Sequence, residues 1–149
     1  MSVEVRLADG ALEIEQALEL RKRVFCGEQG VSLSAERDGR DAEAAHLLAL
    51  DDGAIVGTCR LVLDRGVTRL SRMAVEAGHR RRGLGRAMLT AADDWARAAG
   101  AQRISLHAQL PARPLYERAG YEARGRQFVE EGIEHILMEK PLARASARA

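Results

Sequence analysis

Residues 72–88 read RMAVEAGHRRRGLGRAM, a stretch that passes from a strand through a basic turn into a helix. The apolar run Met73-Ala74-Val75 suits the end of a buried strand, which Gly78 interrupts. From Leu84 onwards the apolar residues recur at helical spacing. A strand and a helix joined by such a turn indicate an α/β arrangement, and the remaining chain is interpreted around it.

The turn itself has the features of an anion site. Arg80, Arg81 and Arg82 precede Gly83 and Gly85, which leave the backbone accessible where the helix begins. The first N–H groups of a helix lack intrahelical partners, and the helix dipole favours negative charge there. The turn is not a P-loop, because no Lys-Ser/Thr pair follows, and it lacks the third glycine of a dinucleotide fingerprint. The arginines alone would also fit a solvated surface; their combination with strand, glycines and helix favours an anion site.

The bulk composition is that of an ordinary globular protein. Of 149 residues, 46% are hydrophobic and 30% charged, with a net charge of +1, which gives no general attraction to nucleic acid or membrane. Cys26 and Cys59 match no metal spacing and suggest reduced thiols in a cytoplasmic protein without a metal. We expect one domain over residues 1–142 and a disordered tail over residues 143–149.

Periodicity and turn residues predict an α/β domain whose mixed sheet of about seven strands is flanked by helices. Tight turns at 51–53 and 64–66 should join three strands into an antiparallel meander, and the strand after the central helix can return parallel. The polar segment 30–43 is either a loop or a short helix over a site. The expected strands are 3–7, 45–50, 55–63, 68–75, 103–107, 122–126 and 133–140, and the expected helices are 11–28, 85–99 and 111–119.

Three groups of residues carry a resemblance to a known family. The sequence RRRGLG at 80–85 matches the R/Q-x-x-G-x-G/A signature of the GCN5-related N-acetyltransferases, the GNAT family. PLYERAGY at 114–121 resembles the family's L-Y-x-x-x-G-F segment. VFCGEQG at 24–30, the Asp41-x-x-x-x-His46 spacing and GIEH at 132–135 resemble the ElaA-like subgroup. Together these segments span most of residues 20–140.

The resemblance implies an acyl-CoA N-acyltransferase fold whose parallel fourth and fifth strands splay apart. The backbone amides of 81–86 would hold the pyrophosphate of acetyl-CoA, and the exposed backbone edge of 73–75 would pair with its pantetheine arm. Gln109 stands where the family often has an asparagine that contacts the cofactor. The expected acetyl-CoA-binding residues are Met73, Ala74, Val75, Arg80, Arg81, Arg82, Gly83, Leu84, Gly85, Arg86 and Gln109.

Tyr116 is the candidate catalytic acid, because its place in the matching segment would let its phenol protonate the departing thiolate. The alternative is a tyrosine that packs the short helix, which is the reading we favour for Tyr121. Many relatives carry a glutamate base on the fourth strand, but Ser71 and Arg72 stand in that area here. A different base, or a proton relayed by ordered water, is therefore required. The candidate bases are Glu28, Asp41, His46 and His107.

The acceptor site should lie between the first helix and the later strands. Its candidate residues are Phe25, Glu28, Gln29, His46 and His107, for which packing or solvation is the alternative. Glu131 and His135 near the last hairpin could line the same pocket. The acidic residues Glu36, Asp38, Asp41 and Glu43 could attract a cationic amine, although such runs are usually solvated.

The combined prediction is an N-acetyltransferase that transfers acetyl from acetyl-CoA to a primary amine of a small molecule or peptide. Direct transfer in a ternary complex is favoured, because Cys26 and Cys59 do not resemble activated nucleophiles. The alternative is a non-catalytic acyl-CoA-binding regulatory or interaction protein. Nucleic-acid binding is disfavoured by the low net charge and the lack of stacking aromatics. The acceptor, the acyl chain length and the oligomeric state, including a homodimer, stay open.

Overall fold

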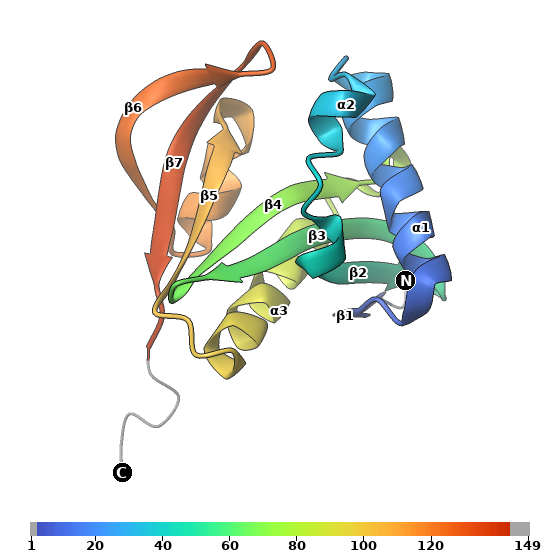
Figure 1. Ribbon diagram of the computed structural model, residues 1–149, viewed down its shortest axis with the longest axis horizontal. Coiled ribbons are helices and arrows are strands. Elements are labelled where there is room, and N and C mark those ends of the chain that lie inside the picture. The colour runs from blue at the N-terminus through green and yellow to red at the C-terminus, as the bar shows by residue number, and fades with distance from the viewer. Residues whose placement is uncertain (1–2, 144–149) are drawn as a thin grey trace.

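The computed structural model of the chain describes residues 3–143, which form a seven-stranded mixed sheet with helices on both faces (Figure 1). The strand order is β1-β2-β3-β4-β5-β7-β6, and only β4 and β5 are parallel. The predicted meander and parallel return are therefore confirmed. The strands are β1 (Val3–Leu7), β2 (Ala45–Asp51), β3 (Ala54–Asp64), β4 (Val67–Val75), β5 (Arg103–Gln109), β6 (Glu122–Glu130) and β7 (Ile133–Pro141).

The strands β5 and β6 extend further than the sequence pattern indicated. β5 continues to Gln109 and β6 to Glu130, because both pair with β7 over their full lengths apart from an irregularity in β6. Gln109 is therefore the last residue of a strand rather than part of the following turn. Residues 144–149, nearly all of the tail expected to be disordered, lie outside the described residues.

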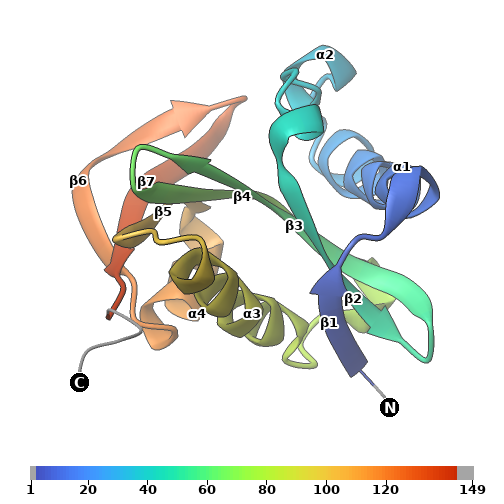
Figure 2. The ribbon, with the colours of Figure 1, turned by 60° about the horizontal axis from the view of Figure 1, so that its bottom comes forward.

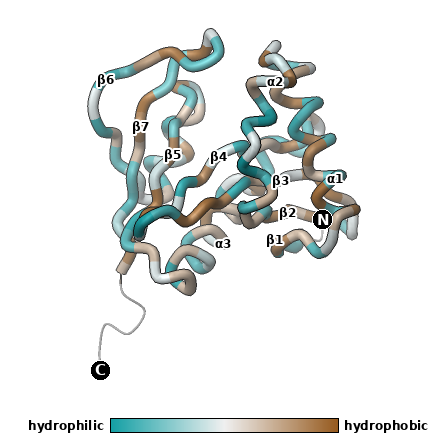
Figure 3. The backbone as a smooth tube through the Cα atoms, viewed as in Figure 1, coloured by the Kyte–Doolittle hydropathy of each residue, from teal (hydrophilic) through white to brown (hydrophobic). Residues whose placement is uncertain are grey.

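Helices pack against both faces of the sheet. They are α1 (Gly10–Arg21), α2 (Leu33–Glu36), α3 (Leu84–Ala98) and α4 (Arg113–Arg118), with 3₁₀ turns at Asp41–Glu43, Ala77–His79 and Leu110–Ala112. α1 covers β2, β3 and β4 on one face, and α3 lies on the opposite face (Figure 2). The segment between α2 and β2 is mainly hydrophilic, since five of residues 37–44 are charged (Figure 3).

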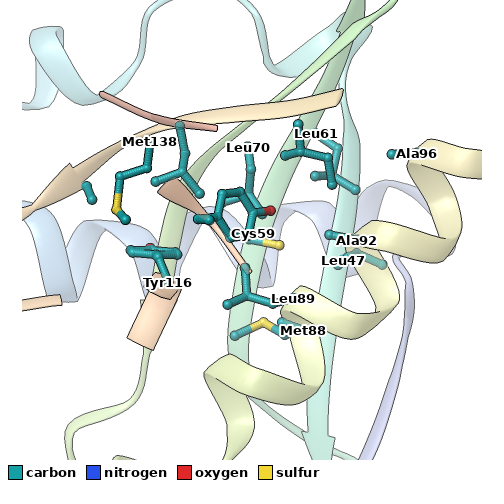
Figure 4. Close-up of a cluster of buried hydrophobic side chains, with 14 of the residues drawn as sticks. Leu47, Cys59, Leu61, Leu70, Met88, Leu89, Ala92, Ala96, Tyr116 and Met138 are labelled. Atoms are coloured by element: carbon teal, nitrogen blue, oxygen red, sulfur yellow. The ribbon is translucent and has the colours of Figure 1, made fainter. Parts of the chain in front are cut away.

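α3 forms because its apolar residues lie on one stripe. Its buried positions are Leu84, Met88, Leu89, Ala92, Asp93 and Ala96. The helix ends at Gly100, whose φ of 83° suits glycine, and the N–H of Ala101 donates to the carbonyl of Ala96 at 2.9 Å. The stripe joins apolar residues of the central strands in the main core, which also includes Tyr116 (Figure 4).

The first helix differs from its prediction in two ways. The chain does not continue as α-helix to residue 28. Residues Lys22–Glu28 form a wider, π-helical segment instead. At the end of this segment the N–H of Gln29 donates to the carbonyl of Val24 at 3.1 Å. Leu12, which we expected on the apolar face of this helix together with Ala17, Leu20, Val24 and Phe25, is 67% exposed, whereas Arg21 is fully buried. Burial of an arginine requires charged or hydrogen-bonding partners, which lie in the candidate site.

Candidate functional site

The site begins where β4 and β5 separate. Their parallel pairing extends only from Val67 opposite Arg103 to Arg69 opposite Ser105. Beyond that point β4 stays with β3 and β5 stays with β7, so the edges of the two strands that face each other are no longer paired. A bulge in β4 at Arg72, whose φ is 56°, lies in the separated part. Such bulges redirect side chains and are frequent beside active sites.

A cavity of about 650 Å³ occupies this separation. Its lining comes from 24–31 after α1, 35–40 around α2, 60–62 in β3, 69–75 in β4, 105–109 in β5, 112–116 at α4 and 130–135 at the β6–β7 turn. The predicted site residues that line it are Phe25, Gln29, Met73, Ala74, Val75, Arg80, His107, Gln109 and Tyr116. The fold thus brings residues from at least seven separate segments of the chain to one cavity.

The loop before α3 lies outside the cavity apart from Arg80, which lines it. Gly83 has a φ of 80°, and the first hydrogen bond of the helix runs from the N–H of Ala87 to the carbonyl of Gly83 at 3.0 Å. The N–H groups of Leu84, Gly85 and Arg86 precede that bond and are available to an anion. The side chains of Arg81, Arg82 and Arg86 are exposed.

Arg80 connects the loop before α3 to the π-helical segment after α1. Its Nη2 lies 2.7 Å from Oε1 of Glu28, and its Nε donates to the carbonyl of Val75 at 2.9 Å. Glu28 therefore sits in an ion pair and does not line the cavity. Gln29, its neighbour, does line the cavity and accepts a hydrogen bond from Nε2 of Gln109 at 2.9 Å, which links the two sides of the separation.

Tyr116 lies in α4, is buried in the main core and lines the cavity. The hydroxyl contacts Sδ of Met73 at 3.9 Å, and the ring meets that of Tyr121 edge to face at a centroid distance of 5.9 Å. Burial, with a smaller contribution from Cys59, raises the pKa of Tyr116 to about 12. The phenol is protonated at neutral pH, as an unperturbed tyrosine is, and burial extends that state to higher pH. Tyr121 does not line the cavity.

His107 is paired with a carboxylate at the cavity. Its Nδ1 lies 3.0 Å from Oε2 of Glu130, and its ring packs edge to face on Phe128 at 5.0 Å. His135 stacks on the same phenylalanine, with Nδ1 2.7 Å from the carbonyl of Ile133. A histidine held through one ring nitrogen by a carboxylate has its other nitrogen available for proton transfer.

His46 and Asp41 lie elsewhere. His46 is 4% exposed, with Nε2 3.0 Å from the carbonyl of Asp41, and it does not line the cavity. Asp41 accepts hydrogen bonds from Arg21 at 2.7 Å and Arg60 at 3.1 Å. Burial alone would raise the pKa of Asp41, but these two arginines lower it overall. A carboxylate held in its charged form is a poor base, which favours His107 among the four candidates.

Sequence reasoning missed the arginines that meet the acidic segment. Nε of Arg21 donates to Glu36 at 2.7 Å, and both side chains are 1% exposed. Arg60 donates to Asp38 at 2.7 Å, and Arg72 lies 3.2 Å from the same carboxylate. Of the four acidic residues considered for amine attraction, Glu36, Asp38 and Asp41 are therefore neutralised by arginines from other elements.

A signal for this network was present in the sequence. Arg60 stands inside the apolar strand sequence TCRLVL at 58–63, where a charge is unusual unless it is paired. Its partners, however, lie about twenty residues away, and no local pattern identifies them. Only the register of β3 and the path of the α2 segment bring them together.

The cysteines offer no nucleophile at the cavity. Cys59 is 1% exposed, burial raises the pKa of its thiol to about 12, and neither cysteine lines the cavity. Within residues 3–143, no group of three or more His, Cys, Asp or Glu side chains is arranged to hold a metal ion. In the same part of the chain, no helix has the length and apolar character required to cross a bilayer.

Comparison with known proteins places this chain in a family. Residues 13–142 match the family model described as an acetyltransferase (GNAT) domain. A Bacillus subtilis protein named as an acetyltransferase is 33% identical over 131 residues, which cover 86% of this chain and 89% of the relative. The crystal structure of a Lactobacillus plantarum protein named as an N-acetyltransferase superposes with a TM-score of 0.88 at 28% identity, covering 96% of this chain and all of the other. Escherichia coli ElaA shares the fold, with a TM-score of 0.83 at 19% identity, over 93% of this chain and 99% of its own.

Proposed function

The chain belongs to the GNAT family of acetyltransferases, and from that premise we propose that it transfers acetyl from acetyl-CoA to a primary amine. The acceptor is a small molecule or a peptide, and transfer is direct, within a ternary complex. The observation that carries the proposal is the buried, protonated phenol of Tyr116, which reaches the cavity where β4 and β5 separate. The two free cysteines fit a cytoplasmic location.

The residues present fit acetyl-CoA. The unpaired edge of β4 from Met73 to Val75 suits the amides of a pantetheine arm, and the N–H groups at the start of α3 suit a pyrophosphate. Arg80 stands between these two sites, and Arg81, Arg82 and Arg86 surround the second with positive charge. When bound, acetyl-CoA supplies the acetyl group as an activated thioester.

Each remaining role falls to a residue of this chain. Tyr116 holds a proton on its hydroxyl oxygen for the sulfur that leaves, and its position at the cavity makes it available there. His107, oriented by Glu130, accepts the proton that the attacking amine loses. Phe25 and Gln29 border the acceptor from the end of the first helix. Neither Cys26 nor Cys59 lines the cavity, which supports direct transfer rather than an acetylated cysteine.

Replacement of Tyr116 tests the proposal. We expect Tyr116→Phe to lower kcat about 100-fold or more with the affinity for coenzyme A unchanged, since general acid catalysis contributes about 10²–10⁴-fold. Thiol release from acetyl-CoA with a panel of amines measures the activity. Tyr121→Phe is the matched control, because Tyr121 lies in the same cluster but not at the cavity. Tight coenzyme A binding by the unaltered protein without turnover of any amine would favour the alternative, a non-catalytic acyl-CoA-binding regulator.

A further inference from the structure

The charges of the cavity are separated between its two sides. Residues that face each other across adjacent strands share one face of the sheet, as do residues two apart on one strand. Arg60 lies opposite Ser71, and Arg69 lies opposite Ser105, so these side chains and that of His107 belong to the same face, which is the floor of the cavity. The floor therefore carries arginines at β3 and β4 and the histidine at β5.

The arginine side retains an excess of positive charge. A network of four arginines and three carboxylates lies at and behind this side, which leaves one positive charge over. Arg60, Arg72, Glu36 and Asp38 line the cavity, and Arg21, Arg37 and Asp41 pair with them from outside its lining. Burial, and next the positive charge of Arg60, lower the pKa of Arg72, as expected where cations are crowded together.

Arg69 adds a second positive charge to this side. It is exposed on β4, lines the cavity, and makes no ion pair within residues 3–143. A guanidinium group presents a planar fork of donors that matches an oxyanion. The opposite side of the cavity carries negative charge, because Glu130 and Glu131 lie at the β6–β7 turn near His107.

We propose that the acceptor amine also carries an oxyanionic group, such as a carboxylate, that binds Arg69. Its amine lies toward His107 and Glu130, and its anion lies toward the arginines of β3 and β4. This inference rests on the proposed acetyl transfer and specifies its substrate class. It reverses the expectation from the acidic run of residues 36–43, whose charges are already paired.

The strand geometry sets the spacing between the two groups. His107 lies one strand across from Arg69 and two residues further along, which corresponds to about 8 Å between their Cα atoms. An amine and a carboxylate separated by three to five methylene groups span a comparable distance. The suitable probes are 4-aminobutanoate, 5-aminopentanoate and 6-aminohexanoate, with pentylamine and 1,5-diaminopentane as partners of matched length that lack the anion. An aminoalkylphosphonate of similar length tests whether phosphate serves as well.

The experiment measures thiol release with each probe, and calorimetric binding of each probe to the protein saturated with coenzyme A. We expect kcat/KM for 5-aminopentanoate to exceed that for pentylamine at least tenfold. Arg69→Ala should remove this preference, Arg69→Lys should retain part of it, and Arg69→Glu should favour 1,5-diaminopentane. The control is Arg126→Ala, an exposed strand arginine away from the cavity.

The outcomes separate this inference from the proposed function. Equal turnover of 5-aminopentanoate and pentylamine would overturn the inference and leave acetyl transfer in place. Binding of 5-aminopentanoate that depends on Arg69, without any thiol release, would support the anion site and count against acetyl transfer. The absence of both binding and turnover for every probe would overturn both the anion site and acetyl transfer.

Discussion

At the residue scale, Tyr116 shows how burial prepares one side chain for chemistry. The same burial that keeps its phenol protonated also links its titration to stability. An unfolded tyrosine releases its proton near pH 10, whereas the folded protein holds the proton of Tyr116 until about pH 12. The folded state therefore binds more protons between these values, and stability falls as the pH rises through them.

We predict that this linkage costs about 1.4 kcal/mol at pH 11 relative to pH 9, from a shift of about two pKa units. Tyr116→Phe should remove that part of the alkaline loss. Denaturant unfolding of both proteins at pH 7, 9 and 11 measures it. The difference in free energy of unfolding between the two proteins should be nearly constant from pH 7 to pH 9 and change only above pH 9. The same pH dependence in both proteins would show that Tyr116 titrates normally in the folded state.

Residue types alone left the base undecided. The sequence offered no reason to prefer His107 over His46 as the base. The structure places His107 beside Glu130 at the cavity and His46 against the backbone of Asp41. Glu130 was not a candidate, because the predicted sixth strand ended four residues before it. The extension of β6 brings its carboxylate to His107.

At the element scale, α2 and the loop after it are held by ion pairs rather than by apolar packing. α2 has only four residues, too few to be stable alone. Glu36 at its end accepts from Arg21 of α1, and Asp38 accepts from Arg60 of β3. Hydrogen bonding by Arg60 is the main reason that the pKa of Asp38 is well below its usual value.

We predict that Glu36→Gln destabilises the protein by about 3 kcal/mol, since it removes the fully buried carboxylate that pairs with Arg21 and leaves that buried arginine with the charge of Asp41 alone within residues 3–143. Glu43→Gln is the matched control: Glu43 is exposed and, among the described residues, pairs with Arg40 alone, so its loss should cost less than about 0.5 kcal/mol. Midpoints of denaturant unfolding compare the two variants. Similar small effects would mean that the network does not hold the α2 segment.

The elements themselves were largely predictable from the sequence. The turns at 51–53 and 64–66, the stripe of α3 and its end at Gly100 depend on neighbours along the chain, and these predictions are confirmed. The π-helical segment after α1 was not predictable, because its residues have the same periodicity as an α-helix over so short a length.

At the scale of the whole molecule, one topological feature creates the site. Beyond Ser105, β5 stays paired with β7 and no longer with β4, so the sheet opens in the middle (Figure 1). The cavity lies between the two halves. A ligand in this opening would contact both halves and should stabilise the entire fold.

We predict that coenzyme A at 100 times its Kd adds about 2.7 kcal/mol to the free energy of unfolding. For a chain of this size that corresponds to a rise in Tm of about 5–10 °C. Thermal unfolding with coenzyme A and with adenosine 3′,5′-bisphosphate, which lacks the pantetheine arm, measures the effect. The two ligands are compared at the same concentration. An equal rise in Tm would then show that the pantetheine arm does not bind between the strands.

The sequence by itself determined the order of the elements, the core stripes, the family signature at 80–85 and the position of Tyr116 in its segment. These features depend on residues within a few turns of one another, so local periodicity and spacing express them. The tertiary structure alone decided the charge of the cavity: it neutralised the acidic run with Arg21, Arg60 and Arg72, and paired His107 with Glu130. Electrostatic pairing depends on distance in space, and strand register rather than chain position decides which charges meet.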